Sequence, residues 1–326
     1  MLKYNFSEKN ISEMQSNRSG VEDVALDWGL GNLSKAEILI WLIYLLIVII
    51  GLPGNVLVIY CFQFSKQLKK WKKTAKMSTY IISLGICDFC TCINVCLFFV
   101  FGRITSRFTS NIIFCKFFGS MYVYQSLALT SSWHVTMIAM ERHLAICHPL
   151  YHRTKFNRIK ISILIITCYI VGFFTSFIHC PILFYTDENG ICVTTFFELP
   201  YNIILLQASS EVFFFDALPT IIIIPMYLKI WIALQKGSLQ MKKASMNVLY
   251  ASVTVFIGFA VCNYPSTFVW FIQVCLKIPS DFTTSLWQIL VISMSTSCCL
   301  NPIIYAFSIP EFRKAILSKF QSKVDS

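Results

Sequence analysis

The feature that most constrains this chain is a series of seven apolar runs, each long enough to cross a lipid bilayer. A transmembrane helix needs about 20 mostly apolar residues, and helices satisfy their own backbone polar groups inside hydrocarbon. The sequence has no repeat of fixed period and no sustained strand-like alternation. It therefore predicts an all-α membrane protein built as a seven-helix bundle. The predicted spans are residues 37–63, 76–102, 112–143, 158–184, 200–234, 244–276 and 283–307.

Composition separates this chain from soluble proteins. Of its 326 residues, 56% are hydrophobic and only 13% are charged, whereas a soluble domain carries about 25% charged residues. Most of the 14 cysteines lie inside the apolar runs, where small packing residues are expected. No nucleophile motif or metal-ligand spacing indicates an enzyme. A seven-span transporter is a remote alternative. Transporters usually have two matched halves, but this sequence shows none, and its odd number of spans disfavours a two-fold repeat.

Lysine and arginine residues set the predicted orientation. Most of the 27 basic residues fall in the segments 66–76, 142–160, 229–243 and 313–323, which all lie on one side of the predicted spans. The positive-inside rule makes that side cytosolic and places the N-terminus outside. This bias accounts for the net charge of +11, so no nucleic-acid partner is needed to explain it.

Three regions follow from this topology. Residues 36–308 form the predicted membrane domain, and residues 309–326 form a short cytosolic tail. The tail contains an amphipathic stretch, Pro310 to Phe320, which predicts a helix lying on the inner membrane surface. Residues 1–35 form a predicted extracellular segment that is glycosylated, because it contains four Asn-X-Ser sequons. These sequons begin at Asn5, Asn10, Asn17 and Asn32.

Several polar residues lie within or at the ends of the apolar runs. Glu141-Arg142-His143 ends the third run, and Asp88 lies in the middle of the second. A Glu–Arg pair at a helix end is as often a solvated surface pair as a functional one. Inside a membrane, however, an ionisable residue needs a partner or a role. The other such residues are Asn55 in the first run, Ser131 in the third, and Asn301-Pro302-Ile303-Ile304-Tyr305 in the seventh.

In combination these motifs resemble the central polar network of rhodopsin-like (class A) G-protein-coupled receptors, and in particular the neuropeptide-receptor group. The resemblance runs from about Leu39 to Phe320. It includes Pro219 with Tyr227 in the fifth run, and Phe259-X-X-Cys262-X-X-Pro265 in the sixth. The implied function is binding of an extracellular ligand and activation of a heterotrimeric G protein. Arrestin and a receptor kinase are further implied partners.

The resemblance also implies roles for single residues. Arg142 would be held by Glu141 at rest and released to meet the G protein, while two tyrosines swing inward. The implied coupling residues are Glu141, Arg142, His143, Tyr227, Asn301, Pro302 and Tyr305. A polar network that holds Na⁺ in many family members would use Asn55, Asp88, Ser131, Ser297 and Asn301. No other cofactor is implied.

The family pattern further implies an outer disulfide between Cys115 and Cys192, with Cys180 and Cys275 as alternative partners. Three departures from the pattern stand out. Asn263 replaces the usual tryptophan of the sixth helix, and the inner end of that helix lacks an acid. The interval from Cys115 to Arg142 is longer than usual, which predicts an insertion or bulge in the outer third helix.

Residues that the sequence lacks disfavour some classes of ligand. No lysine lies between Lys277 and Lys314, which disfavours a retinal-binding opsin, and Tyr124 replaces the aspartate of amine receptors. Glu211 and Asp216 favour a short basic or amidated peptide, with Asp216 either protonated or paired with Asn263. The alternative ligand is a lipid or a small chemosensory molecule. The aromatic residues near these acids have an alternative role as well, which is packing between helices. The predicted pocket consists of Tyr124, Gln125, Glu211, Asn263, Trp270, Trp287 and Gln288.

Overall fold

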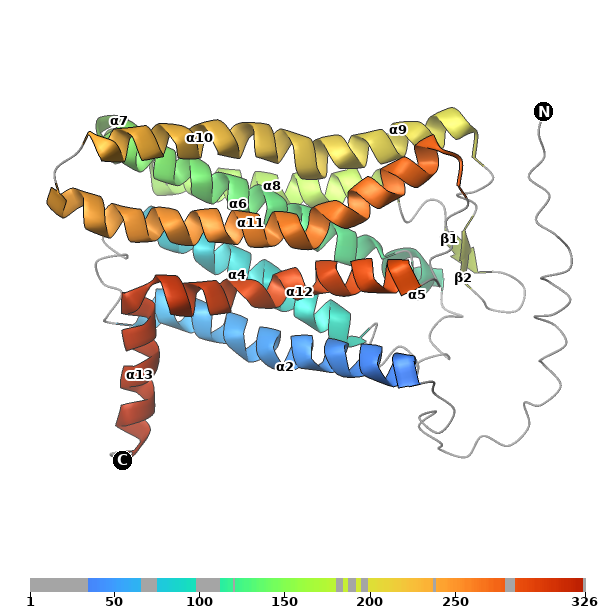
Figure 1. The fold of residues 1–326 in the computed structure, drawn as a ribbon, viewed down its shortest axis with the longest axis horizontal. Helices are drawn as coiled ribbons and strands as arrows, with labels where there is room; N and C mark the ends of the chain where they lie inside the picture. Colours follow the sequence, from blue (N-terminus) through green and yellow to red (C-terminus); the bar gives the residue numbers. More distant parts are fainter. Residues whose placement is uncertain are drawn as a thin grey trace, which may run out of the picture.

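The computed structural model describes residues 35–65, 75–97, 112–119, 121–179, 184–186, 192–194, 199–236, 239–278 and 285–324. Long helices run side by side along the molecule, and a small β-hairpin and helix α13 mark opposite ends of the bundle (Figure 1). This arrangement confirms the predicted all-α bundle. The hairpin end corresponds to the predicted outer side, and the α13 end to the cytosolic side.

Six stretches of helix in the described residues are long and apolar enough to cross a membrane. The seventh, α6, contains many buried hydroxyl groups and lies among its neighbours, contacting α4, α8, α10 and α11. Such a helix can carry polar groups because the surrounding helices supply partners. The long helices are α2 (Lys35–Phe64), α4 (Ala75–Val95), α6 (Tyr122–Cys147), α8 (Arg158–His179), α9 (Tyr201–Glu211), α10 (Leu218–Gln235), α11 (Leu239–Cys275) and α12 (Ser285–Ser308).

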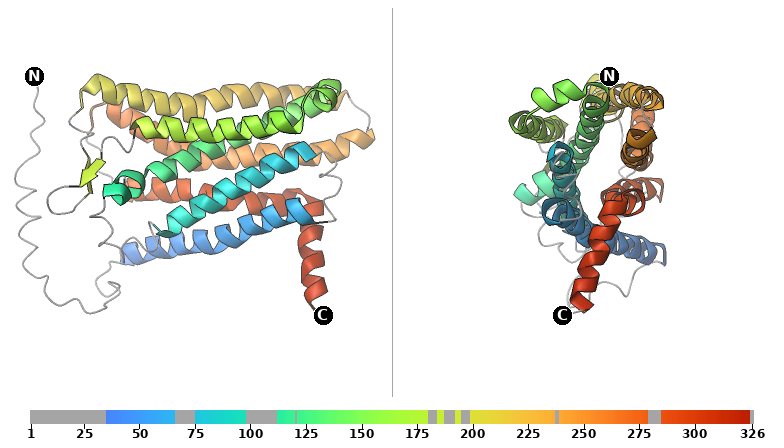
Figure 2. Two further views of the ribbon diagram at one scale, coloured as in Figure 1. Left: turned by 180° about the vertical axis from the view of Figure 1, so that it is seen from behind. Right: turned by 90° about the vertical axis from the view of Figure 1, so that its left-hand side faces the viewer.

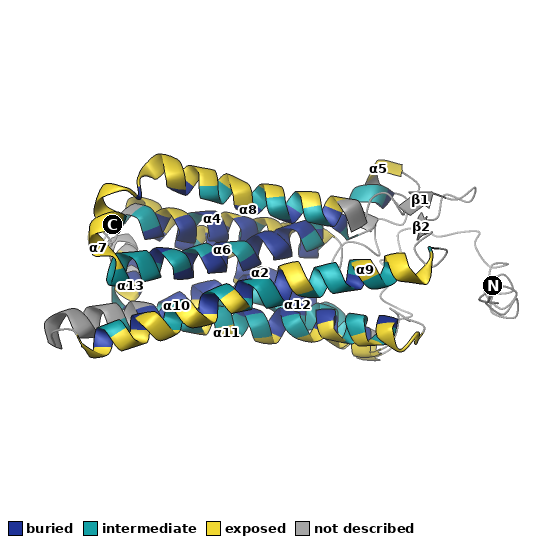
Figure 3. Ribbon diagram, turned by 90° about the horizontal axis from the view of Figure 1, so that it is seen from above, coloured by how far each residue is buried: buried dark blue, intermediate teal, exposed yellow. Residues whose placement is uncertain are grey.

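The outside of the bundle is apolar, as a lipid-facing surface must be. In Figure 3 the exposed residues lie along the outward sides of the helices, and the buried residues face the interior. Helix α8 shows the pattern most clearly, because its exposed apolar residues recur every three or four positions and so share one face. These residues are Ile159, Ile163, Ile166, Ile170 and Phe174.

The outer part of the third span is broken, as the long Cys115–Arg142 interval predicts. A short helix, α5 (Ile112–Phe114), leads into a π-helical turn, η4 (Cys115–Gly119). Met121 then adopts a left-handed backbone with φ of 60°, and α6 begins at Tyr122. The predicted bulge is therefore present, and the prediction of one continuous helix over residues 112–143 is wrong.

A hairpin occupies the outer end of the molecule. Strands β1 (Phe184–Thr186) and β2 (Cys192–Thr194) pair antiparallel, with Tyr185 opposite Val193, and β1 contacts η4. The sequence predicts neither strand, because three residues are too few to show a two-residue period. The predicted fourth span, residues 158–184, is also too long, since α8 ends at His179.

The prolines of the spans lie inside continuous helices or next to a π-helical segment. Figure 1 shows a bend in α11, which contains Pro265, as expected where a backbone N–H is missing. Pro53 and Pro302 lie inside α2 and α12. A π-helical segment, η6 (Val212–Ala217), joins α9 to α10 two residues before Pro219.

Two short helices complete the cytosolic end. Helix α7 (Pro149–Thr154) follows α6, and α13 (Pro310–Val324) extends beyond the predicted Phe320. Figure 2 shows α13 projecting across the direction of the bundle. Phe312 is buried and stacks on Phe62 with 5.8 Å between ring centroids. Arg313 and Lys314 are exposed, so α13 is amphipathic as predicted.

Candidate functional site

A buried carboxylate connects three helices at the centre of the bundle. Asp88 of α4 is 3% exposed. Its Oδ1 accepts a hydrogen bond from Ser131 Oγ of α6 at 3.1 Å, and its Oδ2 accepts one from Asn301 Nδ2 of α12 at 2.7 Å. Hydrogen bonds to a charged group are worth about 1.5–3 kcal/mol each. The carboxyl group thus holds α4, α6 and α12 together.

Asn55 of α2 belongs to a neighbouring layer rather than to the Asp88 cluster. Its Nδ2 donates to the carbonyl of Cys298 at 2.8 Å and to that of Gly51 at 3.0 Å. The bond to Cys298 crosses from α2 to α12. Asn55 therefore extends the polar core to a fourth helix.

A buried histidine adds a polar layer that the sequence analysis did not identify. His134 Nδ1 lies 2.8 Å from the Thr130 carbonyl, and His134 Nε2 lies 2.8 Å from Ser83 Oγ. A carbonyl only accepts, so Nδ1 carries a proton and Nε2 of the neutral ring accepts from Ser83. This bond links α4 to α6. The sequence signal that could have identified this residue is the presence of a histidine inside an apolar span.

The charge pair at the cytosolic end of α6 is held by a third residue. Arg142 Nε donates to Glu141 Oε2 at 2.5 Å, and the two side chains form an ion pair. Glu141 Oε1 lies 3.0 Å from His152 Nε2 of α7. The Glu141 side chain is fully buried, whereas those of Arg142 and His152 are partly exposed. Both oxygens of the carboxylate therefore have partners on the cytosolic side.

His152 is fixed in turn by its surroundings. Lys76 of α4 donates to the His152 carbonyl, and the His152 ring stacks on Phe156 with 5.7 Å between centroids. No local sequence pattern indicates this role, because His152 lies on the separate short helix α7, eleven residues after Glu141. Only the fold brings them together.

Of the other predicted coupling residues, Asn301 lies at the centre of the bundle with Asp88, whereas the two tyrosines pack in an apolar cluster nearer the cytosolic end. Tyr305 is buried between Phe62 and Phe312, at 6.0 and 6.3 Å between ring centroids. Tyr227 packs against the same apolar cluster from α10. Pro302 is buried in α12 beside Gly54.

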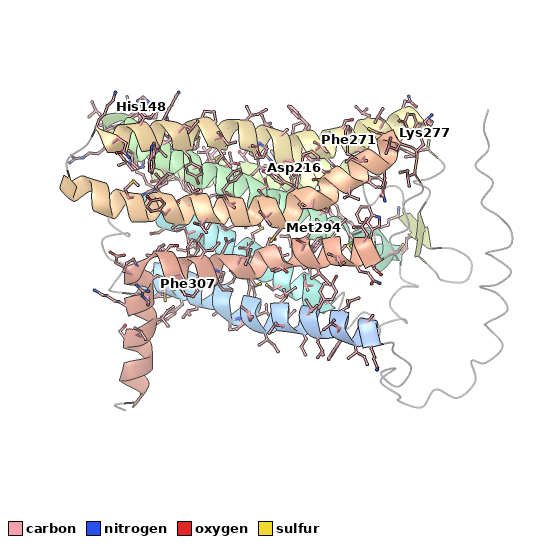
Figure 4. The ribbon with its side chains drawn as sticks, viewed as in Figure 1. His148, Asp216, Phe271, Lys277, Met294 and Phe307 are labelled. Carbon is pink, nitrogen blue, oxygen red and sulfur yellow. The ribbon has the colours of Figure 1, made fainter. Side chains whose placement is uncertain are left out.

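His143 belongs to a different surface from Arg142. Its ring lies 5.4 Å from that of His148, which is exposed at the cytosolic end (Figure 4). Both rings line a cavity of about 750 Å³ between α6, α7, α8 and α10. Lys160 and Met226 also line it. The cavity lies away from the Asp88 cluster.

The predicted Na⁺ ligands fit a cation only in part. Asp88 and Ser131 place oxygen atoms 3.1 Å apart, and oxygen is the ligand that hard cations prefer. Asn301, however, presents its amide N–H to the carboxylate, and Ser297 Oγ donates to the Met294 carbonyl at 2.7 Å. Two of the predicted ligands therefore supply adjacent oxygens in this conformation.

The predicted ligand-pocket residues separate into three groups. Tyr124 OH lies 3.2 Å from Ser295 Oγ, on the α12 side of α6. Gln125 and Glu211 line a cavity of about 10 Å³, the size of one water molecule, together with Ser176 of α8. The rings of Trp270 and Trp287 are 6.4 Å apart, and Gln288 is half-buried beside Trp287. The small cavity beside Gln125 and Glu211 is lined by none of the other predicted pocket residues.

Asp216 has a different partner from the one predicted. It lies on η6 midway along the bundle (Figure 4) and is 2% exposed. Its Oδ2 accepts a hydrogen bond from Thr267 of α11, whereas Asn263 donates to the Phe259 carbonyl of its own helix at 2.9 Å. The predicted Asp216–Asn263 pair is wrong, because Thr267, four residues along α11, takes that position.

The predicted disulfide at the outer end lies partly within the described residues, and the predicted glycosylation sites lie outside them. Cys115 is disulfide-bonded, and Cys275 is a free cysteine. The alternative pairing of Cys115 with Cys275 is therefore wrong, and the pairing with Cys192 stays a prediction because the Cys192 side chain lies outside the described residues. The four sequons also lie in the undescribed N-terminal segment.

Comparison with known proteins matches residues 54–305 to the family described as "7 transmembrane receptor (rhodopsin family)". Among individual relatives, the chain is 24% identical to mouse free fatty acid receptor 3 over 83% of both chains. It is 23% identical to the human type-1 angiotensin II receptor, over 84% of this chain and 78% of the relative.

The rat type-1 angiotensin II receptor A is also 23% identical, over 88% of this chain and 82% of its own. These proteins are receptors and not enzymes. The family match runs from the inner part of α2 into α12 and includes the Asp88, Arg142 and Asn301 positions. This chain belongs to the rhodopsin-like family of seven-transmembrane, G-protein-coupled receptors, which are multi-pass membrane proteins.

Proposed function

We propose that this receptor binds a short basic or amidated peptide at its outer end and activates a heterotrimeric G protein at its cytosolic end. The observation that carries the coupling half is the Arg142–Glu141–His152 cluster. A fully buried carboxylate binds the neighbouring arginine on α6 and is itself bonded to His152 of α7. Breaking this cluster would expose a guanidinium group at the surface where a cytosolic partner binds.

The central polar cluster supports coupling between the two ends. Asp88 is bonded to α6 and α12, and Asn55 bonds α12 from α2. A ligand that shifts α12 or α6 must therefore disturb hydrogen bonds deep in the bundle. Packed interiors change between discrete arrangements, so such a disturbance can reach Arg142, three turns from Ser131.

Charge supports a basic ligand. Glu211 ends α9 on the outer side of Asp216, which lies midway along the bundle and is almost fully buried. Within the described residues, no lysine or arginine is buried, so a fatty-acid carboxylate would lack a buried cationic partner there. The angiotensin receptors among the relatives are named for a peptide and agree with this choice.

The direct test is nucleotide exchange on a purified G protein. The receptor in nanodiscs should accelerate exchange, and a library of amidated basic peptides should contain a sequence that increases the rate. Arg142→Ala should abolish the acceleration while leaving labelled-peptide binding largely intact. If Arg142→Ala couples at the full wild-type rate, the proposed centre of coupling is wrong.

The same preparation distinguishes the alternative ligand classes. Medium- and short-chain fatty acids serve as the comparison set, because one relative is a free fatty acid receptor. Activation by fatty acids and not by peptides would overturn the ligand half of the proposal and leave the coupling half standing.

A further inference from the structure

Two buried thiols meet between helices α4 and α12. Cys92 Sγ donates a hydrogen bond to Cys298 Sγ at 3.2 Å, and Cys298 Sγ donates to the Ser295 carbonyl at 3.0 Å. Both side chains are buried, with exposures of 0% and 1%. A disulfide has an S–S distance of about 2.05 Å, so the two sulfurs need to approach by only about 1 Å.

The neighbouring helix α2 is shaped around this pair. A Cβ on Gly51 would overlap the Cys92 sulfur and lie 3.4 Å from Cys299 Cβ. Asn55, one turn along α2, bonds the carbonyls of Gly51 and Cys298, and its Nδ2 lies 4.0 Å from Cys92 Sγ. Three helices therefore keep the two sulfurs in contact.

We propose that Cys92 and Cys298 are an oxidation site at which a peroxide forms a disulfide between α4 and α12. One thiol loses its proton, and the thiolate attacks hydrogen peroxide; the S–O bond forms as the O–O bond breaks, and the released hydroxide takes up the proton as water. The second thiol then attacks the sulfur of the sulfenic acid, so that the S–S bond forms and the oxygen leaves as a second water. In total, two thiols and one hydrogen peroxide give one disulfide and two waters. Burial of both sulfurs selects a small, neutral oxidant.

The consequence for signalling rests on the proposed function. Cys92 lies four residues after Asp88, and Cys298 lies three residues before Asn301. The disulfide would therefore fix the spacing of α4 and α12 about one helical turn from the Asp88–Asn301 hydrogen bond. A receptor that must shift α12 to activate would be restrained in the resting arrangement. Oxidation would lower nucleotide exchange, and reduction would restore it.

The chemical test is peptide mapping of the purified, full-length receptor. After treatment with hydrogen peroxide, and with remaining thiols alkylated, a linked peptide pair containing Cys92 and Cys298 should appear, lighter by two hydrogens than the reduced pair. Reduction should release it. Recovery of both cysteines as free, alkylated thiols while the exposed Cys90 is oxidised would overturn the proposal.

The functional test compares variants in the nucleotide-exchange assay before and after peroxide. Wild-type activity should fall several-fold, while Cys92→Ser and Cys298→Ser should each keep their untreated rate. Cys299→Ser is the matched control, because Cys299 is adjacent and its thiol bonds the Thr296 carbonyl of its own helix at 3.1 Å. This variant should respond to peroxide like the wild type.

The two tests separate the two proposals. A cross-link without any loss of exchange would overturn the restraint on α12. Absence of exchange activity in the untreated wild type would count against the proposed G-protein coupling, and the mapping would still decide whether the disulfide forms.

Discussion

At the scale of single residues, the proposed coupling site depends on one carboxylate with two partners. Glu141 binds Arg142 through one oxygen and His152 through the other. Removing a partner from a buried charge costs more than removing a surface pair. The sixth helix supplies no acid to replace this restraint, so the rest state depends strongly on Glu141.

Replacing His152 by alanine should raise ligand-independent nucleotide exchange. The change removes one of the two partners of Glu141 and the contact with Phe156, so α7 no longer holds the carboxylate in place. The rise should be smaller than that of Glu141→Ala, which frees Arg142 directly. Arg153→Ala is the matched control, because Arg153 is exposed on the same helix. Equal basal rates in His152→Ala and the wild type would rule out a restraining role.

Replacing Glu211 by glutamine should reduce the potency of an activating basic peptide. The substitution keeps the shape and the capacity to bond Gln207 but removes the negative charge. Loss of one charge-assisted contact is worth about 1.5–3 kcal/mol, or roughly a tenfold to hundredfold loss of potency. Glu311→Gln, at the cytosolic end, controls for a general effect of charge. Unchanged potency would remove Glu211 from the ligand site.

At the scale of elements, close helix packing explains which glycines tolerate a side chain. A Cβ on Gly172 of α8 would overlap Thr130 Oγ1 and approach the Ser126 carbonyl to 2.8 Å. A Cβ on Gly258 of α11 would meet Leu300 and Ile304 at ordinary distances of 3.4 and 3.6 Å. The two positions form a natural comparison.

Gly172→Ala should destabilise the receptor, and Gly258→Ala should not. Overpacking costs about 1–3 kcal/mol, whereas alanine otherwise favours a helix by about 1 kcal/mol. Thermal unfolding in detergent should show a lower midpoint for Gly172→Ala and an unchanged or higher one for Gly258→Ala. The same midpoint in both variants would contradict the tight α6–α8 contact.

The helices and strands differ in how well they can be predicted from the sequence. The seven spans, the amphipathic tail helix and the bulge follow from apolar length, periodicity and an unusual interval, all of which are local properties. The strands of the hairpin have no such signal. The His152 contact and the Thr267 contact of Asp216 depend on how separate helices meet, and a single sequence does not fix that register. Tyr124 and Gln125 are adjacent on α6 but face different helices. Tyr124 therefore contacts Ser295 of α12, whereas Gln125 lies beside Glu211 of α9.

At the scale of the whole molecule, we propose Asp88 as the group through which a bound Na⁺ ion would stabilise the bundle. Replacing Na⁺ by choline at constant ionic strength should lower the unfolding temperature of the wild type, because a ligand that binds only the folded state stabilises it. Asp88→Asn should show no difference between the two salts. An equal response of wild type and variant would exclude Asp88 as a sodium ligand.

The break above α6 has a mechanical consequence. The disulfide-bonded Cys115 anchors the π-helical turn, whereas Ser131 and Arg142 belong to the helix that starts after the left-handed Met121. A displacement at the outer disulfide therefore reaches the polar core through a bend at Met121 and not along one continuous helix. We expect less of it to reach the cytosolic end than an unbroken helix would carry, so a ligand that contacts the bundle helices directly should signal more effectively than one that contacts only the outer turn.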